Sequence, residues 1–175
     1  MRTKPHLPTK TRKPTSAETV ELVTGILEGY AEKAVFRGFS AHPKRGGKAA
    51  YQMVWHYDRR FELLLDVPNK TLRFPSLLPG VPARSPMYRD LQAFVKERTS
   101  GDLPEHRSIT PAKARAALGN ERGVVSLTLT VRDHDFEYGA RKLIQLAHEI
   151  FLVFLVDGPY FEYTVEQLGL DPDQF

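Results

Sequence analysis

The chain has 175 residues, of which 41% are hydrophobic and 26% charged, and its formal net charge is +4. It contains no cysteine, which excludes a disulfide framework, a thiol nucleophile and a thiolate metal site. The length predicts one domain, and the longest apolar run, from Ile150 to Val156, is far shorter than the ~20 residues that a membrane-spanning helix needs.

The charges are sorted along the chain. Five bases and no acid lie in residues 1–15, whereas six acids and no base follow Lys142. Residues 1–15 hold too little apolar surface to offset the entropy of ordering, so we predict a flexible basic arm followed by a single domain over 16–175. The N-terminus also lacks the apolar core of a secretory signal, and we expect a soluble, cytoplasmic protein.

The first half of the domain is predicted to be one helix followed by strands. Thr15 and Glu18 stand at capping-box spacing, and apolar residues follow at helical spacing to about residue 33. Alternating apolar residues predict strands over 35–41, 50–57 and 61–67, with a short partner over 71–74. The short connections between these strands, including the cationic loop 42–48, require antiparallel pairing.

The second half is predicted to be mostly helical. Four prolines in residues 75–86 favour an extended segment that stays outside the sheet. Helix-start, helix-stop and alternation signals then predict the remaining elements: a helix over 86–98, a loop from Thr99, a short helix from Thr110 to Gly119, a strand over 124–131, a long helix over 136–156, and a terminal helical segment over 160–168.

This order of elements indicates the α+β class. A run of strands followed by helices predicts a single, mostly antiparallel sheet of four to five strands. The helices are expected to pack on one side of that sheet, and the long helix over 136–156 closes the fold at its C-terminal end.

The six histidines are the first candidates for chemistry, and their spacing argues against it. None stands four residues from another on a predicted helix, so the zinc-protease pattern is absent. The sequence Asp133-His134-Asp135 is interpreted as a polar turn, and His148 as an imidazole at the edge of an apolar stripe. An enzyme would need a pocket that assembles distant residues such as His56, Arg73, His106 and Tyr138. We therefore predict no catalytic residue, no cofactor and no metal ligand.

Basic residues give a first candidate surface, for a polyanion or nucleic acid. Tyr51, Trp55 and Tyr57 share one face of their predicted strand, but Met53 shares it too, which is typical of core. Stacking of bases on that strand is therefore not expected. The candidate contacts for a polyanion are Lys10, Arg12, Lys13, Lys44, Arg45, Lys48, Arg59 and Arg60.

The all-apolar turn of the last helix gives a second candidate surface, for another protein. A helix that is apolar on all sides must be covered on all sides. The helix over 16–33 and the terminal segment could cover it within the chain, or a second subunit could do so. The candidate interface residues are Ile150, Phe151, Phe154, Tyr160, Phe161 and Tyr163.

The order of one amphipathic helix, three antiparallel strands, a helix, a strand and a long closing helix resembles the type III secretion chaperone-like superfamily and its non-secretion bacterial relatives. The resemblance covers about residues 16–156 and is one of topology. That superfamily usually has a second strand between its middle and last helices, where residues 101–123 are predicted here as a loop and a short helix. The resemblance implies a non-enzymatic dimer that holds an extended or amphipathic segment of another protein.

The sequence thus predicts a non-enzymatic protein-interaction module, chaperone-like or an adaptor. We expect it to act as a homodimer, without a cofactor, and to bind a segment of another protein. The alternative is a polyanion or nucleic-acid binder that uses the N-terminal arm and the 42–48 hairpin tip. The salt dependence of binding separates the two hypotheses.

Overall fold

The computed structural model describes residues 12–174, which form an antiparallel sheet of six strands in the order β1-β2-β3-β4-β6-β5. The predicted α+β class is confirmed, although the described residues contain more than the four to five strands expected. The strands are β1 (Arg37–Lys44), β2 (Lys48–Trp55), β3 (Arg59–Asp66), β4 (Thr71–Leu78), β5 (Ala114–Glu121) and β6 (Val124–Val131).

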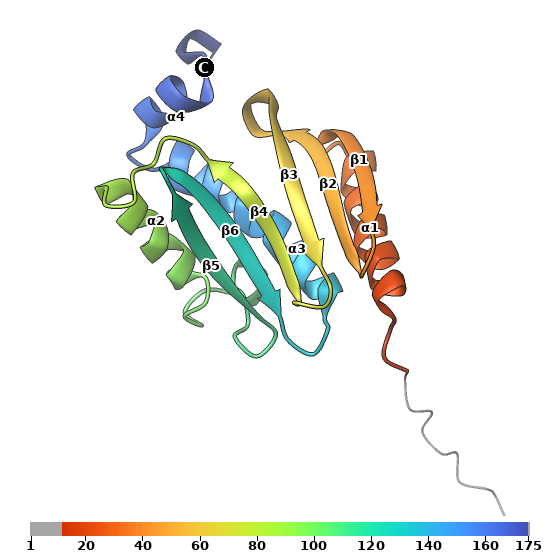
Figure 1. Cartoon of the computed structure of the whole chain (residues 1–175). Helices are drawn as coiled ribbons and strands as arrows, with labels where there is room; N and C mark the ends of the chain where they lie inside the picture. The colour runs from red at the N-terminus through yellow and green to blue at the C-terminus, as the bar shows by residue number, and fades with distance from the viewer. Residues whose placement is uncertain (1–11, 175) are drawn as a thin grey trace, which may run out of the picture.

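The helices lie on one face of this sheet, as expected, and Figure 1 shows the opposite face turned to the viewer with α1 and α3 behind it. Residues 1–11, which include the predicted contact Lys10, lie outside the described residues, and so does Phe175. The helices are α1 (Ser16–Glu32), α2 (Pro86–Glu97), α3 (Phe136–Glu149), its π-helical continuation η3 (Ile150–Val156) and α4 (Phe161–Leu168), and the short 3₁₀ turns are η1 (His56–Asp58), η2 (Glu105–Arg107) and η4 (Pro172–Gln174).

The helix ends follow the local signals in the sequence. Thr15 and Glu18 form the predicted capping box at the start of α1. The Ser85 hydroxyl accepts a hydrogen bond from Tyr88 N at the start of α2. Gly169 ends α4 in the left-handed conformation, which a glycine adopts without a steric penalty.

The predicted helix from Thr110 to Gly119 is wrong, because residues 114–121 form strand β5. This strand pairs with β6 through eight residue pairs, from Ala114 with Val131 to Glu121 with Val124. Alanine favours a helix locally, but the pairing with β6 overrides that preference. Arg122 and Gly123 both have positive φ (52° and 84°), as the tight turn of such a hairpin requires.

The prediction that residues 75–86 stay outside the sheet is wrong for Pro75, which lies inside strand β4. The pairing of β4 with β3 ends at Arg73, and the register with β6 shifts between Phe74 and Leu78. A proline lacks the N–H that a regular ladder uses, so it is tolerated at this irregular position.

One hydrophobic core fills the space between the sheet and the helices. Alternate residues of β2, among them Tyr51 and Met53, are buried against α1 and α3, which confirms that this strand face is core. At Gly139 of α3, an added Cβ would collide with the side chain of Val131 on β6, so the close approach of this helix to the sheet depends on a glycine.

Within residues 12–174, no single helix has both the length and the apolar character needed to cross a bilayer. Only the bent pair Phe136–Val156 and Phe161–Leu168, at an angle of 114°, meets those two criteria together.

Candidate functional site

Two histidines from distant parts of the chain meet on the molecule's surface. His56 Nε2 lies 3.3 Å from His148 Nδ1. Strand β2 ends at Trp55, two residues earlier than predicted, and the chain reverses through Tyr57 and Asp58, both in the left-handed region. His56 therefore lies in a turn and not in the strand predicted over 50–57, and its ring stacks on Phe151 at 4.3 Å between centroids.

The environment of this histidine pair is aromatic. Trp55 lies 4.5 Å from the ring centre of His56 and is nearly parallel to the ring of His148, at 6.1 Å. Burial, followed by repulsion from His148, lowers the pKa of His56 to about 3. The His56 ring is therefore neutral at neutral pH. The His148 side chain is exposed to solvent.

The other residues that were named for an enzyme pocket lie apart from the histidine pair. The Tyr138 hydroxyl accepts a hydrogen bond from Thr110 N at 2.8 Å, and the His106 carbonyl accepts one from the Gln145 side chain. Arg73 lies exposed on the open face of the sheet. The described residues contain no group of three or more His, Cys, Asp or Glu side chains placed to hold a metal ion.

Asp133-His134-Asp135 forms a turn between β6 and α3, as predicted. Asp133 and His134 have positive φ, and the Asp135 carboxylate accepts a hydrogen bond from Tyr138 N at 3.1 Å. The Asp135 carboxylate thus caps α3.

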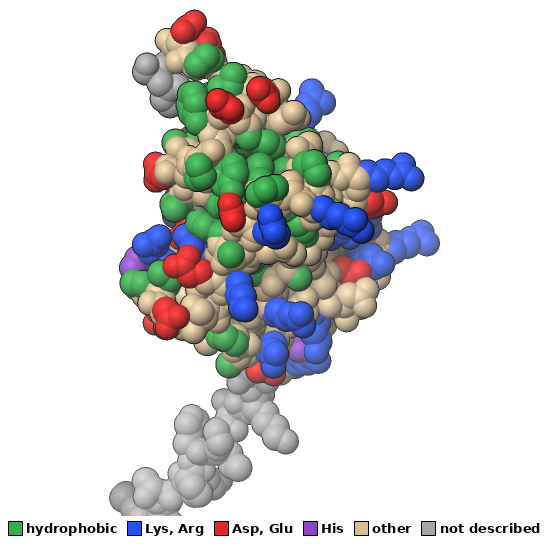
Figure 2. All heavy atoms as spheres, turned by 90° about the vertical axis from the view of Figure 1, so that its left-hand side faces the viewer, with side chains coloured by type: hydrophobic (Ala, Val, Ile, Leu, Met, Phe, Trp, Pro, Cys, Tyr) green, Lys and Arg blue, Asp and Glu red, His purple; other side chains and the backbone are tan. Residues whose placement is uncertain are grey.

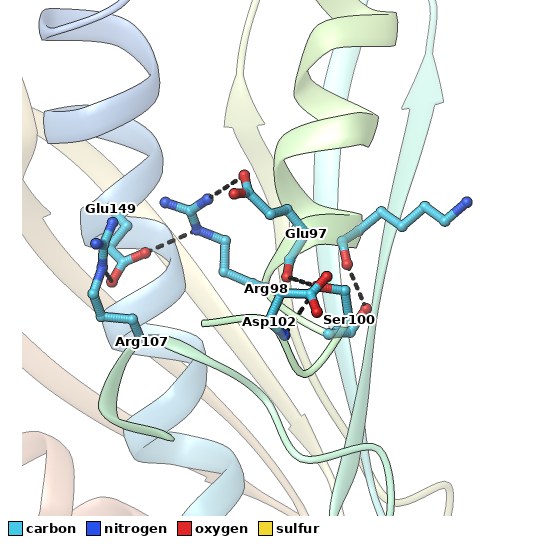
Figure 3. A network of polar contacts seen from close by, with 8 residues as sticks. Glu97, Arg98, Ser100, Asp102, Arg107 and Glu149 are labelled. Carbon is cyan, nitrogen blue, oxygen red and sulfur yellow. Dashed lines mark hydrogen bonds and ion pairs between the residues drawn. The ribbon is translucent and has the colours of Figure 1, made fainter. Parts of the chain in front are cut away.

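A buried ion network joins α2 to α3 (Figure 3). The Arg98 side chain is 5% exposed, and its Nε donates to Glu149 at 3.0 Å while its Nη1 donates to Glu97 at 3.1 Å. Arg107 approaches the other Glu149 oxygen at 4.0 Å, and the Arg98 guanidinium lies 3.5 Å over the Phe94 ring. The adjoining cavity of about 10 Å³ holds a single water at most, so we interpret this network as a structural joint.

A hollow of about 850 Å³ lies between the end of α1 and the edge strand β1. Its charged lining residues are Glu28, Glu32 and Arg37, and the last of these pairs with Asp58 at 2.7 Å. Among the described residues, no histidine or hydroxyl nucleophile lines it.

Basic residues gather at one end of the sheet, which we call the basic end. The hairpin tip around Gly47 touches Ser16 at the start of α1 and accepts a hydrogen bond from Val67 N. Backbone hydrogen bonds from Val131 N to the Lys70 carbonyl and from Arg132 N to the Lys113 carbonyl continue this end across the sheet. The exposed or half-exposed bases of the basic end are Arg12, Lys13, Lys44, Arg45, Lys48, Lys70, Lys113 and Arg132.

The structure brings together most, but not all, of the predicted polyanion contacts. Arg59 and Arg60 begin β3, whereas Lys48 pairs with Asp66 at the end of β3. These two arginines therefore lie about 23 Å along the strand from the basic end. Lys70, Lys113 and Arg132 were not predicted as contacts, because only the sheet order places their turns at the same end of the sheet as the hairpin tip. Figure 2 shows Lys and Arg side chains projecting from the side of the molecule that carries the open sheet face.

Most of the predicted interface residues are packed against other residues of the same chain. Ile150 and Phe151 are fully buried, and the Phe154 ring packs between Phe94 of α2 and Tyr160. The exposed large apolar side chains of this region are Leu152 (44%), Val156 (40%) and Phe161 (44%). We call these three residues the η3–α4 apolar surface. Figure 2 shows hydrophobic side chains gathering in the upper part of the molecule, toward α4.

Two tyrosine hydroxyls anchor α4. Tyr160 donates to Asp90 of α2, and Tyr163 donates to the Pro79 carbonyl just after β4. Burial, together with the hydrogen bond to Asp90, raises the pKa of Tyr160 to about 12, and burial also raises the pKa of Tyr163. Both phenols stay protonated at neutral pH and serve contacts inside the chain.

Comparison with protein-family models, with curated proteins and with solved structures finds no match to this chain.

Proposed function

We propose that this protein is a non-enzymatic interaction module, chaperone-like or an adaptor, that binds an apolar segment of another protein on the η3–α4 apolar surface. The observation that carries the proposal is the exposure of Leu152, Val156 and Phe161 within ten residues of one another. Single exposed apolar residues are ordinary, but several on adjoining elements mark a docking surface.

The charges around this surface define the chemistry of the partner. Asp157, Glu162 and Glu166 are exposed beside the three apolar residues, and no lysine or arginine follows Lys142 in the sequence. An acidic rim favours a partner segment with basic residues beside its apolar anchors, and it speeds the encounter with such a segment.

The arrangement of elements supports the same proposal. Two strands, β5 and β6, lie between α2 and α3, which is the arrangement usual in the type III secretion chaperone-like superfamily. By analogy with that superfamily, we propose that the protein acts as a homodimer, and that it works in the cytoplasm.

The test uses full-length variants with charge introduced at exposed positions. The double variant Leu152→Glu, Phe161→Glu should keep the melting temperature of the wild type but lose the co-purifying partner. The matched control is Leu22→Glu, because Leu22 on α1 is also 43% exposed and lies outside the proposed surface. Loss of the partner in the control, or its retention in the double variant, would overturn the proposal.

A second candidate function is polyanion binding at the basic end. The observation that favours it is the meeting of α1, the β1–β2 tip and the β3–β4 turn there, which brings Lys13, Lys44, Arg45 and Lys70 to one end of the sheet. Clustered bases gain affinity for phosphates by releasing counterions.

A further inference from the structure

The two meeting imidazoles have the separation of a metal chelate. His56 Nε2 and His148 Nδ1 are 3.3 Å apart, and the ring centres are 5.2 Å apart. Two nitrogens each about 2.05 Å from one tetrahedral zinc ion would be about 3.3 Å apart, with imidazole centres about 5.2 Å apart. We propose that His56 and His148 bind one divalent first-row transition-metal ion, such as Zn²⁺ or Cu²⁺.

The rings are held in place before any ion arrives. The His56 ring stacks on Phe151, with 20° between the planes, and the His148 ring is within 6° of parallel to Trp55. Side chains that are fixed by packing lose little freedom on binding, which favours a chelate of defined geometry.

The backbone at both histidines departs from regular structure. Tyr57 and Asp58, which follow His56, are in the left-handed region, and the π-helix η3 begins two residues after His148. Such departures cost free energy and occur often at functional sites. Here they place the two rings against each other.

The chemistry of the pair suits borderline metals. Neutral imidazole nitrogens bind zinc, copper and nickel, and water molecules can complete the coordination shell around two protein ligands. The exposure of His148 gives an ion access from solvent. A bound ion would tie the β2–β3 turn to the junction of α3 and η3. This inference is independent of the proposed function.

The single tryptophan of the chain makes the test direct. Trp55 lies against both histidine rings, so a bound Cu²⁺ ion should quench its fluorescence. We expect titration of the tag-free, full-length protein with copper(II) chloride to quench Trp55 in a saturable way at one ion per chain. Zinc chloride, which does not quench by itself, should compete and restore the emission.

The decisive variant is His148→Gln, because His148 is exposed and its replacement leaves the core intact. We expect at least a tenfold weaker affinity for copper in this variant, with circular dichroism and melting temperature unchanged. The control His106→Gln, at another exposed histidine, should keep the affinity of the wild type. Wild-type affinity in His148→Gln, or no saturable quenching in the wild type, would show that the two rings only share a hydrogen bond.

Discussion

Asp66 ends β3 and holds the turn that follows it. Its carboxylate accepts hydrogen bonds from Asn69 N at 3.1 Å and from Asn69 Nδ2 at 2.8 Å, and Lys48 Nζ lies at 3.6 Å. The side-chain hydrogen bond from Asn69 is the main cause that lowers the pKa of Asp66 below its ordinary value. The ionised carboxylate therefore stabilises the folded state.

Replacing Asp66 with Asn should lower the free energy of unfolding by about 1 kcal/mol at pH 7, since hydrogen bonds to a charged acceptor are lost. A carboxyl group whose pKa is lowered on folding contributes stability above its unfolded pKa and loses it as the pH falls through its folded pKa. The difference between variant and wild type should thus shrink below about pH 4. Urea unfolding at pH 7, 5 and 3 measures it, and a difference independent of pH would contradict this assignment.

At the scale of elements, α2 is joined to α3 through charged side chains and not only through apolar packing. Arg98 is the C-cap residue of α2, and Glu149 is the last residue of α3. Their ion pair therefore connects the C-terminal ends of two helices. Both side chains are largely buried, at 5% and 14% exposure. Breaking a buried pair from one side leaves an uncompensated charge, which costs far more than a surface pair is worth.

The variant Glu149→Ala should therefore lose about 3–5 kcal/mol of unfolding free energy, measured by urea denaturation. Its Arg98 would keep only the exposed Glu97 as a partner.

The double variant Arg98→Met, Glu149→Leu tests the physical reason. Because it removes both charges, it should lose less than either Arg98→Met or Glu149→Leu alone. The surface pair Glu137 and Arg141, one turn apart on α3, serves as the matched control: Glu137→Ala should change stability by less than about 1 kcal/mol. Additive losses in the double variant would show that the pair does not act as a unit.

At the scale of the whole molecule, charge sorted along the sequence becomes charge sorted in space. The basic end gathers the start of α1 and the turns beside Lys70 and Lys113. Strand β4 starts beside that end, and Tyr163 of α4 is bonded to Pro79 just after the far end of β4. The acidic helix α4 and the basic end therefore lie at opposite ends of the sheet, as Figure 1 shows.

If the basic end binds a polyanion, the double variant Lys44→Ala, Arg45→Ala should weaken binding of a single-stranded DNA probe and flatten its salt dependence. On a single strand, each lost phosphate contact reduces the slope of log K against log salt by about 0.7, so we expect a reduction of about 1.4. Fluorescence anisotropy between low and physiological salt measures the slope.

The matched control is Arg60→Ala, because Arg60 lies at the far end of β3 from the hairpin tip. Its salt slope should equal that of the wild type. An equal loss in both variants would indicate diffuse charge attraction, and no measurable binding by the wild type would remove the second candidate function.

Much of the fold could be predicted from local patterns. The capping box at Thr15, the start of α2 at Ser85 and the buried face of β2 follow from the properties of a few neighbouring residues. Strand β5 could not be predicted in the same way, because its alanines favour a helix until β6 is present to pair with it. The candidate surfaces were predicted only in part: Phe161 is exposed as an interface requires, whereas Phe151 is buried against His56.

The sequence by itself determined the α+β class, the helix starts and the sorting of charge, because each depends on composition, on periodicity or on interactions between residues close in the chain. Only the tertiary structure decided that His56 meets His148, that Arg98 meets Glu149, and which apolar residues of η3 remain exposed. Those outcomes depend on sheet order and helix packing, which bring together residues 92 and 51 positions apart. No local pattern carries that information, since the free energy that selects these contacts comes from burying the whole core at once.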